Sequence, residues 1–314
     1  MCHRVRVIVI SLSALSIGAE PLDLGFKPSG NGLFDFDTGV VRGRLRSDEQ
    51  SQGIPIFVDV ETGANLAYGF DNPGIFSYYR ILSANKRWGD AARTWPKSSK
   101  PLPDKCVQIH WPADVEHPIE ITATYRWTSA NTLDLETVVK PDRDMKCFEV
   151  FLSSYFNKNF KSAVYVGPAL HASGKPAFLA PEFSPLVAGT YLAFPRDRRS
   201  AQIIYDGRWE YGPHPVQFSV TQFLALPLCM KQDPTSGITL LIMSRPEDCF
   251  AIETPYNMDP PDGVAGHYSM YISLFGEDIQ AGQTARAHTR LIVERNVSAR
   301  RALDLYHEFI DEKN

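Results

Sequence analysis

The chain has 314 residues, of which 44% are hydrophobic, and it carries a formal net charge of -4. A chain of this length and composition can bury a substantial core. The slight acidity argues against nucleic acid as the partner of the whole chain, because phosphate binding requires a basic face, whereas local basic segments remain compatible with an acidic glycan.

The first 19 residues are typical of a secretory signal peptide. Residues 1–6 are basic, residues 7–17 form a short apolar run, and Gly18 and Ala19 are small residues suited to cleavage. The apolar run is too short to span a bilayer, and no second long apolar run follows. We therefore expect a secreted or periplasmic protein whose mature part, residues 20–314, is a single domain.

Strand patterns dominate the rest of the chain. In residues 119–127 apolar side chains alternate with polar ones, and a turn at 128–132 leads into a second run at 133–139, which predicts a β-hairpin. Further runs bounded by Pro and Gly predict strands at 54–60, 148–153, 163–166, 238–243, 268–274 and 285–293.

Only the tail shows helical spacing. Residues 299–312 place Ala302, Leu305, Tyr306, Phe309 and Ile310 on one stripe, and Ser298 is positioned to cap the helix. Because strands and helices do not alternate, a doubly wound sheet or an α/β barrel is disfavoured. The prediction is an all-β fold, one large antiparallel β-sandwich with a short C-terminal helix.

Signal cleavage would leave four cysteines, Cys106, Cys147, Cys229 and Cys249. An even number in an oxidising compartment permits two disulfides, but the wide spacing defines no framework. Buried free thiols remain the alternative.

The first candidate site is the turn-bounded segment 74–96. It combines Tyr and Trp rings with the cations Arg80, Arg87 and Arg93, and it ends near Trp95. Aromatic faces can stack on a pyranose, and Arg offers paired donors to hydroxyls or to a carboxylate, so the mixture suits a sugar or uronate. The alternative is a strand and loop with core rings and solvated arginines.

A second patch lies at residues 206–214. Asp206, Trp209, Glu210 and His214 stand there among turn residues. Loops on a rigid sheet often carry catalytic side chains, so His214 is a candidate acid or base. His171 and His267 are the other histidines considered for this role, each of which could equally serve as an ordinary hydrogen-bonding residue.

Metal and cofactor motifs are weak or absent. The set His110, Asp114 and His117 fits no familiar metal spacing, and turn chemistry alone explains Asp259 and Asp262. The sequence contains no nucleophile elbow, phosphate loop, dinucleotide fingerprint or His-Glu-x-x-His. We expect no metal and no cofactor.

Four short segments, at 80–87, 151–157, 250–255 and 278–284, resemble in order the motifs of the galactose mutarotase-like superfamily of β-supersandwich proteins. This superfamily includes aldose 1-epimerases and domains of polysaccharide lyases and glycosidases. The resemblance implies that Glu253 is the general base, that Arg80 or Arg87 binds substrate, and that Asp206 is a candidate for binding a hydroxyl. The position of the proton-donating His falls at Ser153, which puts simple mutarotation in doubt.

The leading hypothesis is an exported carbohydrate-active enzyme that uses acid–base chemistry on a sugar or an acidic glycan, as a lyase, glycosidase or epimerase. The alternative is a non-catalytic glycan-binding protein. The candidate catalytic residues are Glu253, His214 and His267. The candidate substrate-binding residues, several of which we expect to line one concave face with Glu253 and His214, are Arg80, Arg87, Arg93, Trp95, Asp206, Trp209 and Tyr256.

Overall fold

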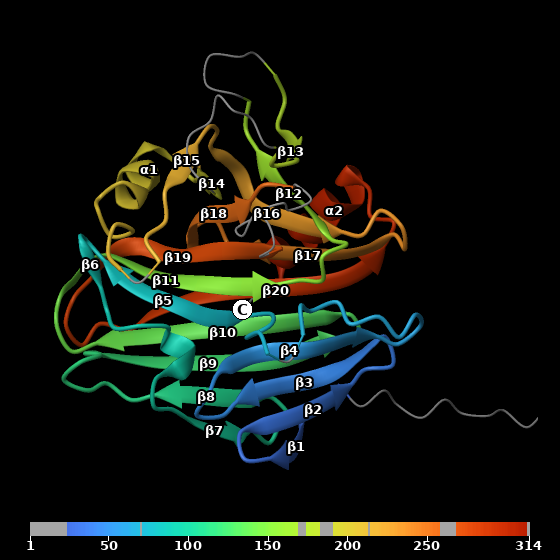
Figure 1. Ribbon diagram of the computed structural model, residues 1–314, viewed down its shortest axis with the longest axis horizontal. Helices are drawn as coiled ribbons and strands as arrows, with labels where there is room; N and C mark the ends of the chain where they lie inside the picture. The colour runs from blue at the N-terminus through green and yellow to red at the C-terminus, as the bar shows by residue number, and fades with distance from the viewer. Residues whose placement is uncertain are drawn as a thin grey trace, which may run out of the picture.

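The computed structural model describes residues 24–69, 71–168, 174–182, 191–212, 214–257 and 268–312, so the predicted signal peptide lies outside the described residues. Three β-sheets make up most of this part of the chain (Figure 1). The four-stranded sheet contains β1 (Lys27–Gly30), β2 (Leu33–Asp37), β3 (Val41–Ser47) and β4 (Gln52–Asp59).

The two larger sheets have nine and seven strands. In spatial order the nine-stranded sheet runs β13 (Ala177–Leu179), β12 (Lys161–Val166), β16 (Leu224–Gln232), β17 (Ile238–Ser244), β20 (Ala285–Arg295), β10 (Thr132–Pro141), β9 (Ile119–Ser129), β8 (Val107–Trp111) and β7 (Ser98–Pro101). The seven-stranded sheet runs β15 (Phe218–Val220), β14 (Tyr191–Pro195), β18 (Cys249–Pro255), β19 (Ser269–Ile279), β11 (Met145–Tyr155), β5 (Ser77–Ser83) and β6 (Lys86–Arg87).

Nearly all strand pairs are antiparallel; the pair of β14 and β15 is parallel. The hairpin predicted at 119–139 is confirmed as β9 and β10, in which Leu135 pairs with Tyr125. The other six predicted strands are confirmed as β4, β11, β12, β17, β19 and β20. The all-β prediction is therefore correct.

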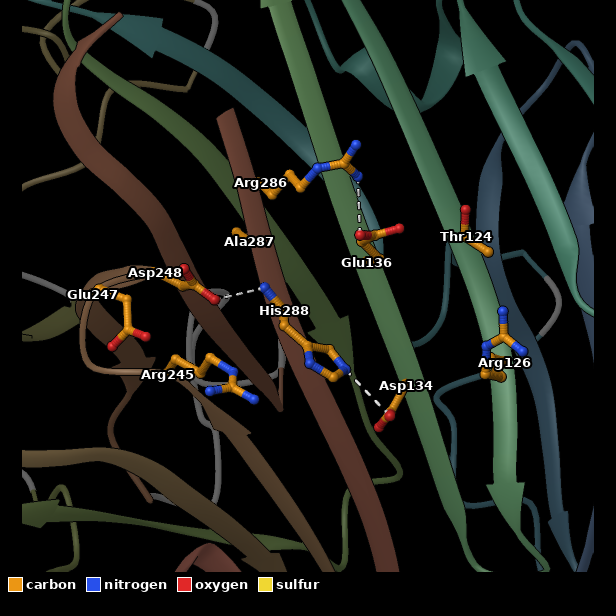
Figure 2. A pocket seen from close by; sticks show the side chains of 10 residues that line it. All are labelled: Thr124, Arg126, Asp134, Glu136, Arg245, Glu247, Asp248, Arg286, Ala287 and His288. Atoms are coloured by element: carbon orange, nitrogen blue, oxygen red, sulfur yellow. Dashed lines mark hydrogen bonds and ion pairs between the residues drawn. The ribbon is translucent and has the colours of Figure 1, made fainter. Parts of the chain in front are cut away.

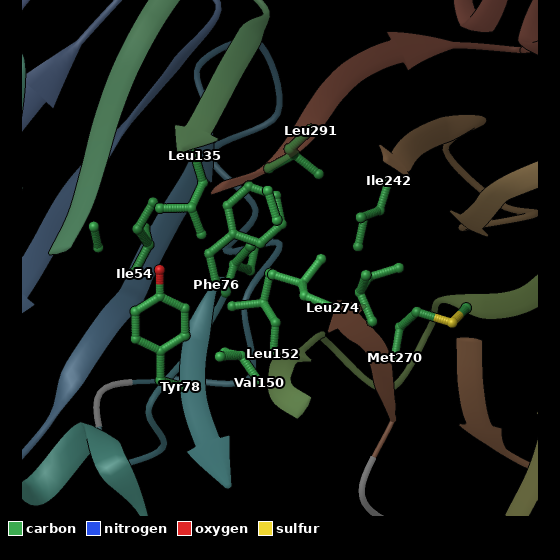
Figure 3. Packing of buried hydrophobic residues seen from close by; sticks show 14 of the residues in the cluster. Ile54, Phe76, Tyr78, Leu135, Val150, Leu152, Ile242, Met270, Leu274 and Leu291 are labelled. Carbon is green, nitrogen blue, oxygen red and sulfur yellow. The ribbon is translucent and has the colours of Figure 1, made fainter. Parts of the chain in front are cut away.

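The core lies between the two large sheets (Figure 3). Leu135 and Leu291 of the nine-stranded sheet and Leu152 and Leu274 of the seven-stranded sheet belong to the same buried cluster. Each such side chain contributes roughly 1.5–3 kcal/mol when it leaves water. The residues that alternate with them on the seven-stranded sheet point to its other face, which we call the outer face.

The four-stranded sheet extends this core. Phe36 and Phe57 pack against Trp127 of β9, with ring centroids 5.0 and 6.2 Å away, and the Phe57 and Trp127 rings are stacked. The aromatic contacts join the N-terminal strands to the nine-stranded sheet.

The C-terminal helix α2 (Ala299–Asp311) is confirmed. The side chain of Ser298 accepts a hydrogen bond from the backbone N–H of Arg301, as the capping position predicts. The expected stripe packs against apolar residues on the outer side of the nine-stranded sheet, among them Leu241, Met243 and Ile292. Its last member, Ile310, is only partly buried.

Most of the helix lies in the tail, as predicted, but a second and shorter helix, α1 (Arg198–Ile204), follows β14. The Asp197 side chain accepts from Ser200 at its N-terminus, and Ile203 and Ile204 are buried. Two turns are too short to display a helical period in the sequence. A 3₁₀ turn, η1 (Ala92–Thr94), also forms within the segment 74–96.

The four predicted mature cysteines are free thiols in the structure, and burial raises the pKa of Cys106 to about 11. This supports the buried-thiol alternative over two disulfides. Within the described ranges, no helix is both long and apolar enough to cross a membrane.

Candidate functional site

A cavity of about 530 Å³ opens on the outer face of the seven-stranded sheet. Seven aromatic side chains line it together with Asn72, Pro73, Arg80, Arg93, His214, Pro215 and Val216. We call it the aromatic cavity; its rings are those of Tyr79, Phe151, Tyr155, Tyr191, Trp209, Phe218 and Tyr271. Aromatic walls with a few polar groups are typical of a small-molecule site.

Strand alternation and one bulge direct these side chains outward. On β11, Val150 and Leu152 enter the core, so Phe151 faces the other way. The register between β5 and β11 shifts beside Phe151. Because a bulge inserts one extra residue, the neighbours Tyr79 and Arg80 both reach the cavity.

Arg80 is a buried cation in the wall of this cavity. Its side chain is fully buried, and Nη2 donates to the carbonyl oxygen of His214 over 2.6 Å. Its guanidinium carbon lies 4.9 Å from the ring centroids of both Tyr79 and Trp209. Arg80 therefore ties the segment around residues 209–214 to strand β5 while keeping positive charge at the site.

Arg93 supplies a second cation from η1. Its guanidinium carbon lies 4.7 Å from the Tyr79 ring centroid, and its Nη1 is buried without a hydrogen-bond partner in the described part of the chain. A buried donor that lacks an acceptor costs about 1–3 kcal/mol. An acceptor oxygen on a ligand would remove this penalty.

The charges that line the cavity are of one sign. Arg80 and Arg93 are its cations, and no carboxylate is found among the described lining residues. Burial raises the pKa of Tyr191 to about 12, so its hydroxyl stays protonated at neutral pH. The lining thus offers cations, hydroxyl donors and ring faces.

Glu253 lies on the same side of the sheet but does not line the cavity. Its side chain is 1% exposed, and it pairs through β18 with Tyr271, which is part of the cavity. Burial, followed by the nearby Glu149 carboxylate, raises the pKa of Glu253 well above its usual range. Only one of its oxygens, Oε1, has a hydrogen-bond partner in the described residues, the Ser273 hydroxyl at 3.0 Å.

The Ser273 hydroxyl connects two buried carboxyl groups. Its Oγ lies 2.7 Å from Glu149 Oε1 as well as 3.0 Å from Glu253 Oε1. One hydroxyl has a single proton, so it donates to only one of them. Burial raises the pKa of Glu149 too, but Arg208 Nη1 bonds its other oxygen at 2.8 Å and counteracts this rise. Among the described residues no cation counteracts the raised pKa of Glu253.

Arg208 anchors the segment that carries Trp209 and His214. Its side chain is fully buried, and Nη2 reaches both Asp206 Oδ2 and the carbonyl of Cys147, each at 2.8 Å. The ion pairs therefore fix one wall of the aromatic cavity to strand β11 beneath it.

The structure brings together four of the predicted site residues, Arg80, Arg93, Trp209 and His214. The expectation of one shared concave face is wrong for Trp95 and Glu253. Trp95 stacks on His117 at 3.9 Å between ring centroids and lines a different groove with Lys97. His267 lies outside the described residues, as do His171, Asp259 and Asp262.

Three further candidates also lie away from the cavity. Arg87 bonds Asp90 and the carbonyl of Gly212, Asp206 pairs with Arg208, and Tyr256 belongs to the core between the large sheets. The roles assigned to these residues stay predictions.

Five of the cavity rings are not among the candidate residues identified from the sequence, namely Phe151, Tyr155, Tyr191, Phe218 and Tyr271. Strands β11, β14 and β19, which carry four of these rings, are largely buried on both faces, so their sequences lack the polar alternation that would mark an exposed side. Strand β15, which carries Phe218, has only three residues and shows no period.

A second cavity, of about 480 Å³, lies on the outer side of the nine-stranded sheet (Figure 2). We call it the charged cavity; it is lined by Thr124, Arg126, Asp134, Glu136, Arg245, Glu247, Asp248, Arg286, Ala287 and His288. Arg286 pairs with Glu136 at 3.0 Å, and His288 Nε2 lies 3.2 Å from Asp134 Oδ2. These charges largely satisfy one another, which makes the cavity a weaker candidate.

The residues His110, Asp114 and His117 are not gathered into one site. His117 Nδ1 lies 3.2 Å from Asp114, and His110 faces Thr122 and Glu120 instead. Over the described ranges, no group of three His, Cys, Asp or Glu side chains is arranged to hold a metal ion.

Comparison with known proteins identifies the fold. No family profile matches the chain, and no curated protein matches it. Among solved structures, a Synechocystis protein is similar with a TM-score of 0.54 and 11% identity, over 87% of this chain and 99% of that one. An aldose epimerase homologue from C. elegans is similar with a TM-score of 0.50 and 10% identity, over 85% of this chain and 99% of that one.

The α-N-acetylgalactosaminidase of Bifidobacterium bifidum is similar with a TM-score of 0.51 and 12% identity. The match covers 88% of this chain but 38% of that enzyme. At such identities the likeness establishes the fold alone. The chain has the galactose mutarotase-like fold, as its sequence motifs predict.

Proposed function

We propose that this chain, with its galactose mutarotase-like fold, binds an acidic sugar residue in the aromatic cavity and acts on it by acid–base chemistry. The observation that carries the proposal is the pairing of two arginines with seven rings in a lining without a described carboxylate. Rings stack on the sugar, and Arg80 and Arg93 neutralise its carboxylate.

Among the reactions considered from the sequence, this lining favours β-elimination. A glycosidase ordinarily needs two carboxyl groups at the scissile bond, and the described lining offers none. In an elimination, the His214 imidazole would take the proton beside the carboxylate. The bond to the leaving oxygen would break, and a tyrosine hydroxyl would protonate that oxygen.

A binding protein without catalysis is the second candidate. The observation that favours it is Ser153, which occupies the position where the resemblance implies the proton-donating His. Ser153 is fully buried, and its hydroxyl donates to the carbonyl of Ser77 at 2.9 Å. It therefore offers no proton to a ligand in the cavity.

The test is to incubate the purified protein with uronate-bearing glycans and with neutral glycans. Turnover is measured from the absorbance of the unsaturated product that β-elimination forms. We expect turnover of an acidic glycan, and a loss of about a hundredfold or more for His214→Ala with affinity largely kept. Binding without turnover would support the binding-protein candidate. A preference for neutral glycans would contradict the proposal.

We also propose that the protein is exported, because residues 1–19 have the pattern of a secretory signal peptide. N-terminal sequencing of the protein recovered from outside the cytoplasm should find a start near residue 19 or 20. A start at Met1 in that fraction would contradict signal cleavage.

A further inference from the structure

A cavity of about 540 Å³ adjoins the aromatic cavity. The two share Trp209, Pro215, Val216 and Phe218, so these four residues form a common wall. We call the neighbour the Tyr205 cavity; its other lining residues are Ile204, Tyr205, Gly207, Glu210 and Gln217.

The Tyr205 ring is exposed yet held in place. It is 59% exposed, which is unusual for so large a hydrophobic side chain in this protein. Its hydroxyl accepts the backbone N–H of Val220 at 3.1 Å, which fixes the ring beside β15. A ring that is accessible and already positioned loses little freedom when a sugar stacks on it.

The two cavities differ in charge. Arg80 and Arg93 line the aromatic cavity, whereas the Tyr205 cavity is lined by the Glu210 carboxylate and the Gln217 amide, with no cation among its described residues. A negatively charged ligand would be repelled by Glu210, while hydroxyl and amine donors would find acceptors there.

We infer that the Tyr205 cavity is an adjoining sugar subsite that accepts a residue without negative charge. This rests on the proposed function of the aromatic cavity. The preferred ligand is then a glycan in which an acidic sugar is linked to a neutral or amino sugar. The common wall lies between the two residues.

The experiment measures calorimetric binding of three ligands to the whole mature protein: free glucuronate, a uronate–hexose disaccharide and a uronate–uronate disaccharide. We expect the mixed disaccharide to bind about tenfold more tightly than the di-uronate, because both can stack on Tyr205 but only the di-uronate brings a second carboxylate to Glu210. Glu210→Lys should reverse this order without changing the affinity for free glucuronate.

Ring and hydroxyl contributions are separated by two substitutions. Tyr205→Ala should weaken binding of the mixed disaccharide by about tenfold. Tyr205→Phe keeps the ring but loses the hydroxyl contact to Val220 that positions it, so it should weaken binding by a smaller factor. Tyr211→Ala is the matched control, because Tyr211 is an exposed tyrosine of the same segment that lines neither cavity. It should leave the difference between the disaccharides intact.

The outcomes separate this inference from the function beneath it. One outcome is that free glucuronate binds, both disaccharides bind with equal affinity, and Glu210→Lys changes the affinity for neither disaccharide. This outcome disproves the subsite but leaves the acidic-sugar site in place. If glucuronate and both disaccharides all fail to bind the wild-type protein, the proposed function fails as well.

Discussion

The two sheet faces that point away from the core carry cavities of similar size that differ in how their charged groups are paired. In the charged cavity, carboxylates stand opposite arginines and a histidine within ion-pair distance. In the aromatic cavity, Arg93 leaves a buried donor without an acceptor among the described residues, and the surrounding side chains are rings. This difference in charge pairing is the reason that we propose the aromatic cavity, and not the charged cavity, as the binding site.

The largest effect on stability is expected for a substitution of Arg208, in the network beneath the aromatic cavity. Arg208→Ala leaves Glu149 as an uncompensated buried charge and should lower the free energy of unfolding by about 3–5 kcal/mol. Chemical denaturation measures this loss. Arg126→Ala is the control, because the Arg126–Asp104 pair is about half-exposed and should contribute about 1 kcal/mol or less. Equal effects would show that the network beneath the aromatic cavity is not a special anchor.

A smaller effect is expected from Glu253. Its folded pKa is raised, so its protonated form stabilises the native state below the ordinary value of 4.5, and this stability is lost as the pH rises toward the folded pKa. Glu253→Gln imitates the protonated acid, so it should remove the part of the pH-dependent loss of stability that comes from Glu253. Denaturation across a pH series measures it.

Glu277→Gln provides the comparison for this pH series, because Glu277 is an exposed residue at the far end of β19. It should reproduce the wild-type profile. A Glu253→Gln profile that also matches wild type would show that Glu253 is ionised in the native protein.

The smallest effect is expected in the charged cavity. Arg286→Ala removes an exposed ion pair with Glu136 and should change stability by about 1 kcal/mol or less, with no change in glycan affinity. Calorimetry with the same uronate glycan checks the second point. A tenfold loss of affinity would move the candidate site to this face.

The strands and the tail helix were predictable because each has a local signature. Alternation marks the β9–β10 hairpin, and the stripe from Ala302 to Phe309 marks α2. The helix α1 has only two turns, and its burial against the sheet is a tertiary contact that no local pattern expresses.

The site was predictable in part for similar reasons. Arg93, Trp209 and His214 stand in turn-rich segments, where rings and charges indicate function. Tyr191 and Tyr271 read as core residues, since both faces of their strands are covered and only the third dimension shows that they face a cavity. The motif resemblance pointed to Glu253, but its burial depends on Tyr271, Ser273 and Glu149 meeting across three strands.

The most direct test is the affinity of glucuronate against that of glucose, its uncharged counterpart, for the wild-type protein and for Arg93→Ala. The two sugars differ at one carboxylate, so the comparison isolates the charge that the aromatic cavity is proposed to recognise. We expect the wild type to prefer glucuronate by about tenfold or more, and Arg93→Ala to lose most of that preference. Arg300→Ala, which removes a highly exposed arginine of α2, should keep it. Equal binding of the two sugars by the wild type, or an unchanged preference in Arg93→Ala, would contradict the account.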